Sequence, residues 1–257
     1  MKKQHLLFLC LATLSLAYSC KKDDTISSNG TSSTKEPIDN KTTGFFTSVY
    51  YQVDGSATNQ SVVSGTQNAF AMFYRSRKDT VAIPATKVWI NGIETSVMPY
   101  GNLSQIHFQS TSTGAMLDMN GDAIWKIYDT TYSEIPDFTF NHRLPFPTVL
   151  GTIDDSLSKS KPSALDIEIA GADSVTVYID GNVLNNAPGV LVKQFVPNHN
   201  NLKFTVDEMK NLFPSDVSGT KNGVEIIAHT TTTQQFEGRY YSFKKITIYR
   251  GAVWVTK

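Results

Sequence analysis

Val88-Trp89-Ile90-Asn91-Gly92 decides the fold class, because this stretch joins a β-strand pattern to a tight-turn signal. Val, Ile and Trp are enriched in strands, and Asn-Gly tolerates the positive φ angles of a two-residue hairpin turn. The stretch returns 89 positions later as Val177-Tyr178-Ile179-Asp180-Gly181. From Gly44 onward, similar short runs are broken by Gly, Pro, Asn and Asp at intervals of roughly ten residues, which predicts an all-β protein.

The predicted strands are rich in Val, Ile, Tyr, Phe and Thr. They cover 45–53, 69–75, 86–90, 105–109, 115–119, 123–128, 138–141, 165–169, 175–179, 190–196, 202–205, 224–230, 239–248 and 252–256. Asn91-Gly92, Asn120-Gly121 and Asp180-Gly181 are predicted as tight hairpin turns. One short helix is predicted over 206–213, because Thr205 and Glu208 have the spacing of a capping box and Pro214 would end the helix.

The repeated stretch predicts two tandem immunoglobulin-like antiparallel β-sandwiches, with the short helix in the second. We expect domain 1 over residues 44–143 and domain 2 over residues 144–257. The boundary is expected within His142–Thr152, because Pro145 and Pro147 cannot donate hydrogen bonds to a sheet ladder.

Trp89 and Tyr178 are the candidate ligand-binding residues. Neighbouring side chains of a strand point to opposite faces, so Val88 and Ile90 are expected to point inward and Trp89 outward. In the second copy, Val175, Val177 and Ile179 are expected to point inward and Tyr178 is the equivalent outward aromatic. Trp125 and Ile127 are expected on the core side. A flat aromatic ring beside polar side chains is suited to stacking on the apolar C–H face of a sugar. The alternative is that a loop or the other domain covers each ring.

No other motif supports a chemical site. Asp118, Asn120 and Asp122 have the spacing of a calcium-binding loop, but Ala123 stands where that loop needs Gly. An Asn-Gly hairpin explains the same stretch, so calcium binding stays open. The histidines are dispersed and no nucleophile is paired with a base, so we expect no catalytic residue, no metal ligand, no cofactor and no enzymatic activity.

The N-terminus has the pattern of a signal peptide over residues 1–19. Lys2 and Lys3 are followed by the apolar run 6–16 and by small residues before Cys20. The run is shorter than the roughly 20 residues that a membrane-spanning helix needs. Residues 20–43 are mostly polar and are expected to form a flexible tether.

Charge and cysteine content narrow the function classes. The chain has 23 basic and 23 acidic residues, and removal of Lys2 and Lys3 with the signal peptide would leave a formal net charge of −2. This balance argues against nucleic-acid binding. The two cysteines are Cys10 and Cys20. If Cys10 is removed and Cys20 is modified, no thiol remains for a disulfide.

The residues around Cys20 resemble the lipobox of bacterial lipoproteins, in which the cysteine is acylated. Ala17 departs from that pattern, since the position usually holds Leu. Lys21-Lys22-Asp23-Asp24 resembles the signal that exports some lipoproteins of the Bacteroidota to the cell surface. The resemblance implies lipid attachment at Cys20 and an outer-membrane location, with the chain exposed on the cell surface. Whether it faces the surface or the periplasm stays open.

This resemblance implies two functions. The first is a non-catalytic binding module, for glycans as in the accessory lipoproteins of starch-utilisation-type systems, or for another envelope protein. The second is a structural or adhesive component, such as a fimbrillin-like subunit or an envelope scaffold. The sequence does not determine the ligand, the partner or the oligomeric state.

Overall fold

The computed structural model describes residues 43–53, 65, 67–74, 87–100, 103–109, 119, 121–128, 135–151, 153, 156–181, 190–195, 202–213 and 220–257. Its elements are strands with one short helix, so the all-β prediction is confirmed. The predicted signal peptide, Cys20 and the tether up to residue 42 lie outside the described residues. Within the described part, no helix is long and apolar enough to cross a membrane.

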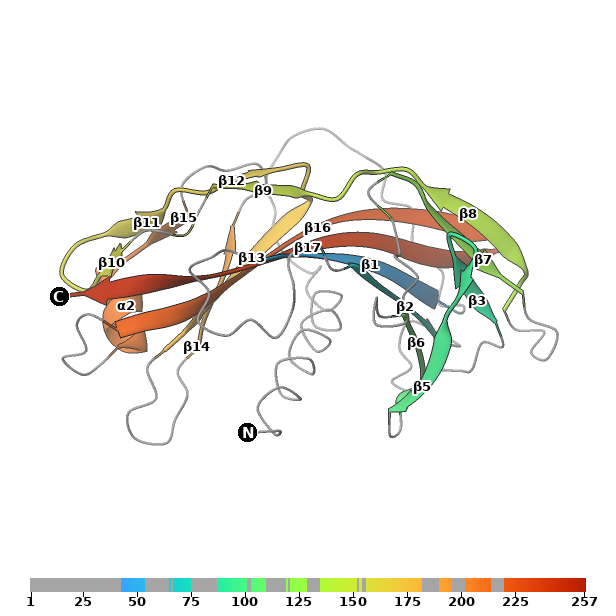
Figure 1. Cartoon of the computed structure of the whole chain (residues 1–257), viewed down its shortest axis with the longest axis horizontal. Helices are drawn as coiled ribbons and strands as arrows, with labels where there is room; N and C mark the ends of the chain where they lie inside the picture. Colours follow the sequence, from blue (N-terminus) through green and yellow to red (C-terminus); the bar gives the residue numbers. More distant parts are fainter. Residues whose placement is uncertain are drawn as a thin grey trace. The chain divides into compact units, whose positions relative to one another are not determined.

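A nine-stranded sheet is the main element of the fold (Figure 1). Eight strands follow the order β14-β13-β16-β17-β1-β2-β6-β5, and β10 pairs with the end of β17. The first strand runs parallel to β17, while β2 is antiparallel to β1. The strands are β1 (Thr43–Val53), β2 (Gln67–Tyr74), β5 (Ser96–Tyr100), β6 (Leu103–Gln109), β10 (Ser156–Ser158), β13 (Ser174–Asp180), β14 (Val190–Phe195), β16 (Thr220–Phe236) and β17 (Arg239–Thr256).

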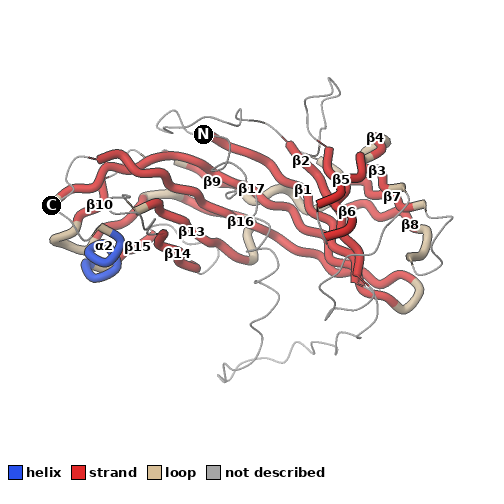
Figure 2. Tube along the Cα trace, turned by 90° about the horizontal axis from the view of Figure 1, so that it is seen from below, coloured by secondary structure: helices blue, strands red, loops and turns tan. Residues whose placement is uncertain are grey.

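The β16–β17 hairpin extends much further than the sequence predicted. The two strands pair from Thr220↔Val255 to Phe236↔Arg239, and they run side by side in Figure 2. Their turn is Glu237-Gly238, with φ angles of 48° and 77°. Both angles are positive, as a two-residue hairpin turn of this kind requires. The predicted strands 239–248 and 252–256 are one continuous strand, because Gly251 between them pairs with Val224 inside the ladder.

A four-stranded sheet lies on one side of the large sheet (Figure 1). It contains β3 (Val88–Ile90), β4 (Ile93–Glu94), β7 (Ala123–Ile127) and β8 (Phe138–His142), in the order β4-β3-β7-β8. Asn91 (φ 48°) and Gly92 (φ 78°) form the predicted two-residue turn between β3 and β4. The prediction of a two-residue turn at Asp180-Gly181 is wrong. Asp180 pairs with Val190, so the connection between the two strands is longer than two residues. Asn120 lies outside the described residues.

The N-terminal core cluster fills the space between these two sheets. Its centre is aromatic: Phe46 of β1 stacks on Phe243 of β17, with ring centroids 4.6 Å apart, and Phe138 stacks on Phe236 at 4.1 Å. The cluster consists of Phe46, Ala69, Ala71, Phe73, Val88, Ile90, Met119, Ala123, Trp125, Ile127, Ile135, Phe138, Tyr241 and Phe243. The predicted inward positions of Val88, Ile90 and Trp125 are therefore confirmed.

The C-terminal core cluster lies under smaller elements. These are the pairs β9 (Thr148–Leu150) with β12 (Glu168–Ala170) and β11 (Ser163–Leu165) with β15 (Leu202–Phe204), together with helix α2 (Val206–Leu212). Val175, Val177 and Ile179 of β13 point into this cluster as predicted. The other members include Val149, Leu157, Ile169, Phe204, Met209, Val224, Ile226, Tyr249, Val253 and Val255.

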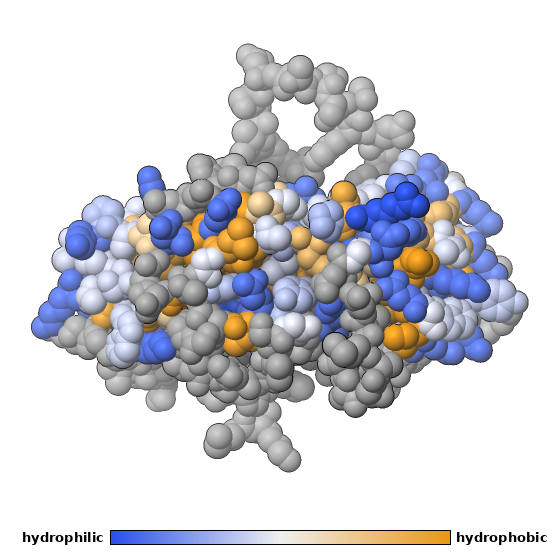
Figure 3. Space-filling view, turned by 45° about the horizontal axis from the view of Figure 1, so that its top comes forward, coloured by the Kyte–Doolittle hydropathy of each residue, from blue (hydrophilic) through white to orange (hydrophobic). Residues whose placement is uncertain are grey.

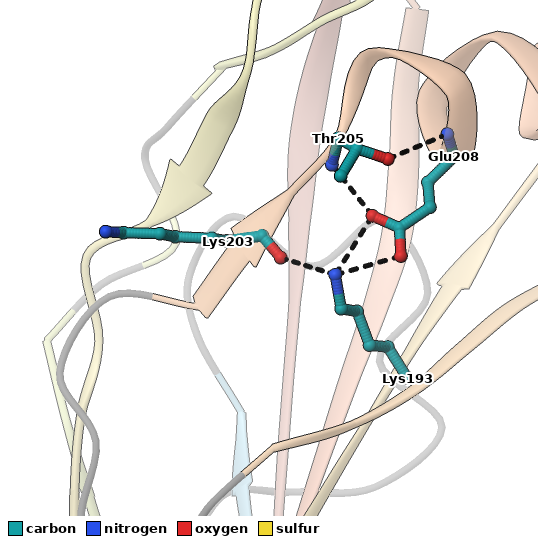
Figure 4. Close-up of polar contacts among 4 residues, drawn as sticks. All are labelled: Lys193, Lys203, Thr205 and Glu208. Atoms are coloured by element: carbon teal, nitrogen blue, oxygen red, sulfur yellow. Dashed lines mark hydrogen bonds and ion pairs between the residues drawn. The ribbon is translucent and has the colours of Figure 1, made fainter.

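Helix α2 begins with the predicted capping box (Figure 4). The Glu208 backbone N–H donates to Thr205 Oγ1 at 3.2 Å, and the Thr205 N–H donates to Glu208 Oε2 at 2.7 Å. Lys193 Nζ donates to Glu208 Oε2 and to the carbonyl of Lys203, both at 2.9 Å. Burial alone would raise the pKa of Glu208, but the hydrogen bonds from Thr205 and Lys193 lower it. This network ties the helix to β14 and β15.

The two core clusters share strands. Residues 143–147 connect β8 on the N-terminal cluster to β9 on the C-terminal cluster, inside the predicted boundary. However, β17 supplies Tyr241 and Phe243 to the first cluster and Tyr249, Val253 and Val255 to the second. A cut at residue 143 would therefore remove part of the N-terminal core. The tandem immunoglobulin-like arrangement stays a prediction.

Candidate functional site on the outer face of the four-stranded sheet

Trp89 lies on the face of the four-stranded sheet that points away from the N-terminal core cluster. Its neighbours Val88 and Ile90 are fully buried, whereas Trp89 itself is half-buried. Trp89 is paired with Lys126 of β7 on one side and with Glu94 of β4 on the other. The predicted outward orientation of Trp89 is thus confirmed, and its ring is neither fully open nor fully covered.

Strand β7 brings a second aromatic side chain to this face. Ala123, Trp125 and Ile127 are buried, and the residues between them point outward. Ile124 is 42% exposed, and Tyr128, directly after the strand, is 48% exposed. The Tyr128 N–H donates to the Lys87 carbonyl at 3.1 Å, so Tyr128 lies beside β3, diagonally across from Trp89. Diagonal neighbours on a sheet lie within reach of aromatic side chains.

We call this surface the outer face; its side chains are those of Lys87, Trp89, Glu94, Ile124, Lys126, Tyr128, Thr139 and Asn141. Tyr128 was not among the residues predicted for this site. The signal was available, since Ile124, Lys126 and Tyr128 alternate with inward residues, but the pairing of β7 with β3 is a tertiary feature. On the side of the molecule shown in Figure 3, groups of apolar side chains are interrupted by hydrophilic ones.

Two lysines flank the Trp89 ring. Lys87 Nζ lies 5.9 Å and Lys126 Nζ 5.8 Å from the ring centroid. Ammonium groups within about 6 Å of an indole centroid are attracted by its π electrons. Both lysine side chains are exposed. The outer face therefore combines an aromatic ring with two positive charges.

A hydrogen-bond network stiffens one end of the outer face. Asn91 Oδ1 accepts from the Ile124 N–H at 2.7 Å, and Asn91 Nδ2 donates to the Asp122 carbonyl at 3.1 Å. Asn141 Nδ2 donates to Asp122 Oδ2 at 2.6 Å. These bonds join β3, β7 and β8 at their ends and hold the exposed side chains on a rigid support.

The structure does not test the calcium interpretation. Of the residues in that pattern, Asp118 and Asn120 lie outside the described residues. Asp122 is described, and one of its carboxylate oxygens accepts the hydrogen bond from Asn141. Among the described residues, no group of three or more His, Cys, Asp or Glu side chains could hold a metal ion.

Tyr178 lies on a different sheet from Trp89. It is half-buried on β13, between Val192 of β14 and Glu225 of β16. Glu225 forms an ion pair with Arg250, at 2.7 Å between Oε2 and Nε. The exposed apolar neighbours on β14 are aliphatic, namely Val190 and Val192. The structure therefore does not bring Trp89 and Tyr178 together.

A buried lysine lies beneath the end of the outer face. Lys245 is fully buried, and its Nζ donates to the carbonyls of Gly121 at 2.7 Å and Met119 at 3.3 Å. Burial lowers the pKa of Lys245 to about 8, against the opposing effect of Asp122. Burial and the nearby Lys245 lower the pKa of His142 to about 4. Neither His142 ring nitrogen has a hydrogen-bond partner within the described structure.

Lys245 has a structural role, because neither it nor His142 is open to solvent. Its bonds hold the Met119 and Gly121 carbonyls shortly before β7. Lys245 was not among the residues predicted from the sequence. Its signal is a charged side chain at an inward position, between Phe243 and Thr247 on the same face of β17.

No protein-family model matches this sequence, and a search of curated proteins found no match.

Proposed function

We propose that this chain is a non-catalytic binding module that is anchored to the outer membrane by lipid on Cys20, faces the cell surface and binds a glycan through the outer face. The observation that carries this proposal is the pair of aromatic side chains, Trp89 and Tyr128, on adjacent strands of one exposed face. We further propose two tandem immunoglobulin-like domains that share strand β17, and the presence of two separate β-rich core clusters supports this.

A sugar fits the chemistry of this surface. One face of a pyranose is lined by C–H groups and packs against an aromatic ring, while its hydroxyls need polar partners at the rim. Glu94 and Thr139 are exposed, lie in the same row across the sheet as Trp89 and supply such partners. The rigid sheet also lowers the entropy cost of binding, because the backbone that carries the site is ordered beforehand.

The test is a glycan array probed with the full chain in detergent, followed by calorimetry on each hit. We expect Trp89→Ala to weaken binding by at least tenfold, because stacking on an aromatic ring is lost, and Tyr128→Ala to weaken it less. Tyr178→Ala is the matched control, since it removes a half-buried aromatic from another sheet. Equal binding by the Trp89→Ala variant and the unaltered chain would refute the proposal, as would failure of every glycan to bind.

The anchor can be tested separately. Labelling of cells with a clickable palmitate analogue should mark the unaltered chain and leave a Cys20→Ala variant unlabelled, because acylation needs the thiol. Protease added to intact cells should then degrade the anchored chain if it faces outward. Labelling of the Cys20→Ala variant would show that the lipid is attached to a residue other than Cys20.

A second candidate is a structural or adhesive role, such as a fimbrillin-like subunit, and an open sheet edge favours it. Strand β13 pairs with β16 only between Val224 and His229, and the Thr231 N–H beyond it donates to Asp173 at 2.6 Å. From Thr232 to Phe236 no described strand pairs with this edge. Thr233, Gln234 and Gln235 are exposed.

This edge suits a second copy of the chain. Residues 230–236 contain no charge and no Pro, so they lack the usual features that block edge-to-edge pairing. Since Thr231 directs its N–H outward, Thr233 and Gln235 direct theirs outward as well. Antiparallel pairing of two copies about Thr233 would satisfy these groups. Light scattering of the full chain in detergent should show a dimer that Thr233→Pro abolishes; a monomer at all concentrations would rule this candidate out.

A further inference from the structure

We propose that the outer face binds an acidic sugar, with the ring stacked on Trp89 and its anionic group held by Lys87 and Lys126. This inference rests on the proposed function and names its ligand class: a pyranose that carries a carboxylate or a sulfate. The proposal is supported by two ammonium groups, which lie 5.9 and 5.8 Å from the centroid of one half-buried indole ring.

The two lysines have no acidic partner in the described structure. Glu94 lies opposite Trp89 on the neighbouring strand β4, yet it forms no ion pair with either lysine. This differs from Lys193, whose Nζ is bonded to both a carboxylate and a carbonyl. Lys87 and Lys126 therefore keep their hydrogen-bond donors available to a ligand.

Their placement follows from the sheet. Lys87 directly precedes β3, two residues before Trp89, and Lys126 stands directly opposite Trp89 on β7. An anion that meets both ammonium groups is therefore brought over or beside the indole ring. Of these three side chains, a neutral sugar would use Trp89 alone and leave both lysines to water, whereas a uronic acid or a sulfated sugar uses all three.

The described acidic side chains on or near the outer face leave this positive charge in place. Asp122 is turned to Asn141 at one end of the outer face. Asp137 is exposed, next to the start of β8. Glu94 lies on the opposite side of Trp89 from Lys126, since β4 and β7 flank β3 on different edges. The positive charge is thus concentrated on the β3–β7 side of the ring.

The test compares three oligosaccharides of six sugars by calorimetry on the full chain in detergent: a galacturonate oligomer, a sulfated glucan oligomer and a neutral glucan oligomer. We expect one of the acidic ligands to bind at least about fivefold more tightly than the neutral one. This preference should shrink as sodium chloride is raised, because salt screens exposed charges. The better acidic ligand identifies the anionic group.

Variants separate the charge from the ring. Lys87→Met and Lys126→Met keep most of the aliphatic stem and should each weaken acidic-ligand binding by roughly fivefold while leaving neutral-ligand binding within twofold. Trp89→Ala should weaken both. Lys210→Met, at an exposed lysine of helix α2, is the matched control and should change neither.

The outcomes distinguish the two proposals. If neutral and acidic oligomers bind equally well and the lysine variants change nothing, the acidic-sugar inference is wrong and the glycan-binding proposal survives. If no oligosaccharide or array glycan binds, both proposals fail. If inorganic sulfate alone competes as well as the sulfated sugar, the lysines form a simple anion site and the inference is also wrong.

Discussion

Replacement of Phe243 by Ala tests whether the two core clusters form one folding unit. Phe243 is fully buried, stacks on Phe46 at 4.6 Å and contacts Phe140 at 4.1 Å between ring centroids. Removal of a buried Phe side chain costs about 3–5 kcal/mol, through lost burial and the cavity that remains. With a slope of about 2–3 kcal/mol per molar urea, the unfolding midpoint should fall by roughly 1.5 M.

Tryptophan fluorescence can report on each cluster separately. Trp125 is fully buried in the N-terminal core cluster, whereas Trp254 is 45% exposed near the end of β17, beside β10. Two reporter proteins, each retaining one of these residues with the other tryptophans replaced by Phe, should show the same midpoint. Because β16 and β17 pass through both clusters, Phe243→Ala should shift both reporters together.

A shift of the Trp125 reporter alone would refute this reasoning. The clusters would then unfold independently, as expected for two tandem domains that divide near residue 143. Ser242→Ala is the matched control, because this half-buried side chain lies next to Phe243 on the other face of β17. It should change the unfolding free energy by about 0.5 kcal/mol or less.

Three further predictions follow from other contacts. Gly44→Ala should lower the melting temperature, because a Cβ there would lie 2.5 Å from Tyr241 Cδ1 and overpacking costs about 1–3 kcal/mol; calorimetry that shows no change would contradict this packing. Lys193→Ala should cost only about 0.5–1 kcal/mol, since the ion pair with Glu208 is partly exposed, and NMR titration should show the Glu208 pKa rising toward its ordinary value. Stability should fall between pH 6.5 and 4, because the unfolded chain binds a proton at His142 near pH 6.5 while the folded chain binds it only near 4. At about 1.4 kcal/mol per pKa unit, His142 contributes roughly 3.5 kcal/mol at most, and His229, whose pKa burial also lowers to about 4, acts in the same direction. Urea titrations in which His142→Asn keeps the full pH dependence would oppose the His142 contribution.

Local features were predictable from the sequence because they depend on neighbouring residues. The alternation in β3, β7 and β13 gave the correct inward residues, and the Asn91-Gly92 turn and the Thr205–Glu208 capping box formed as expected. The same reasoning failed where a local signal lacked support from the sheet. Asp180-Gly181 has suitable turn residues, but Asp180 of β13 pairs with Val190 of β14. The connection is therefore longer than a two-residue turn.

Long-range pairing accounts for the features that the sequence missed. The Thr-rich segment 230–236 has no apolar alternation, yet it is a strand because β17 satisfies its backbone on one edge. Lys245 carries no sign of its partners, since the carbonyls of Met119 and Gly121 lie more than a hundred residues earlier in the chain. Tyr128 lies diagonally across from Trp89 only because β7 pairs with β3.

The sequence by itself determined the all-β class, the inward and outward faces of individual strands, the Asn91-Gly92 turn and the capped helix. These depend on a two-residue alternation and on backbone preferences that act within a few residues. Only the tertiary structure decided that Tyr241 and Phe243 complete the N-terminal core cluster and that Trp89, Tyr128 and two lysines share one face. The physical reason is that strand order and register are set by the joint packing of distant segments, which no single stretch of sequence contains.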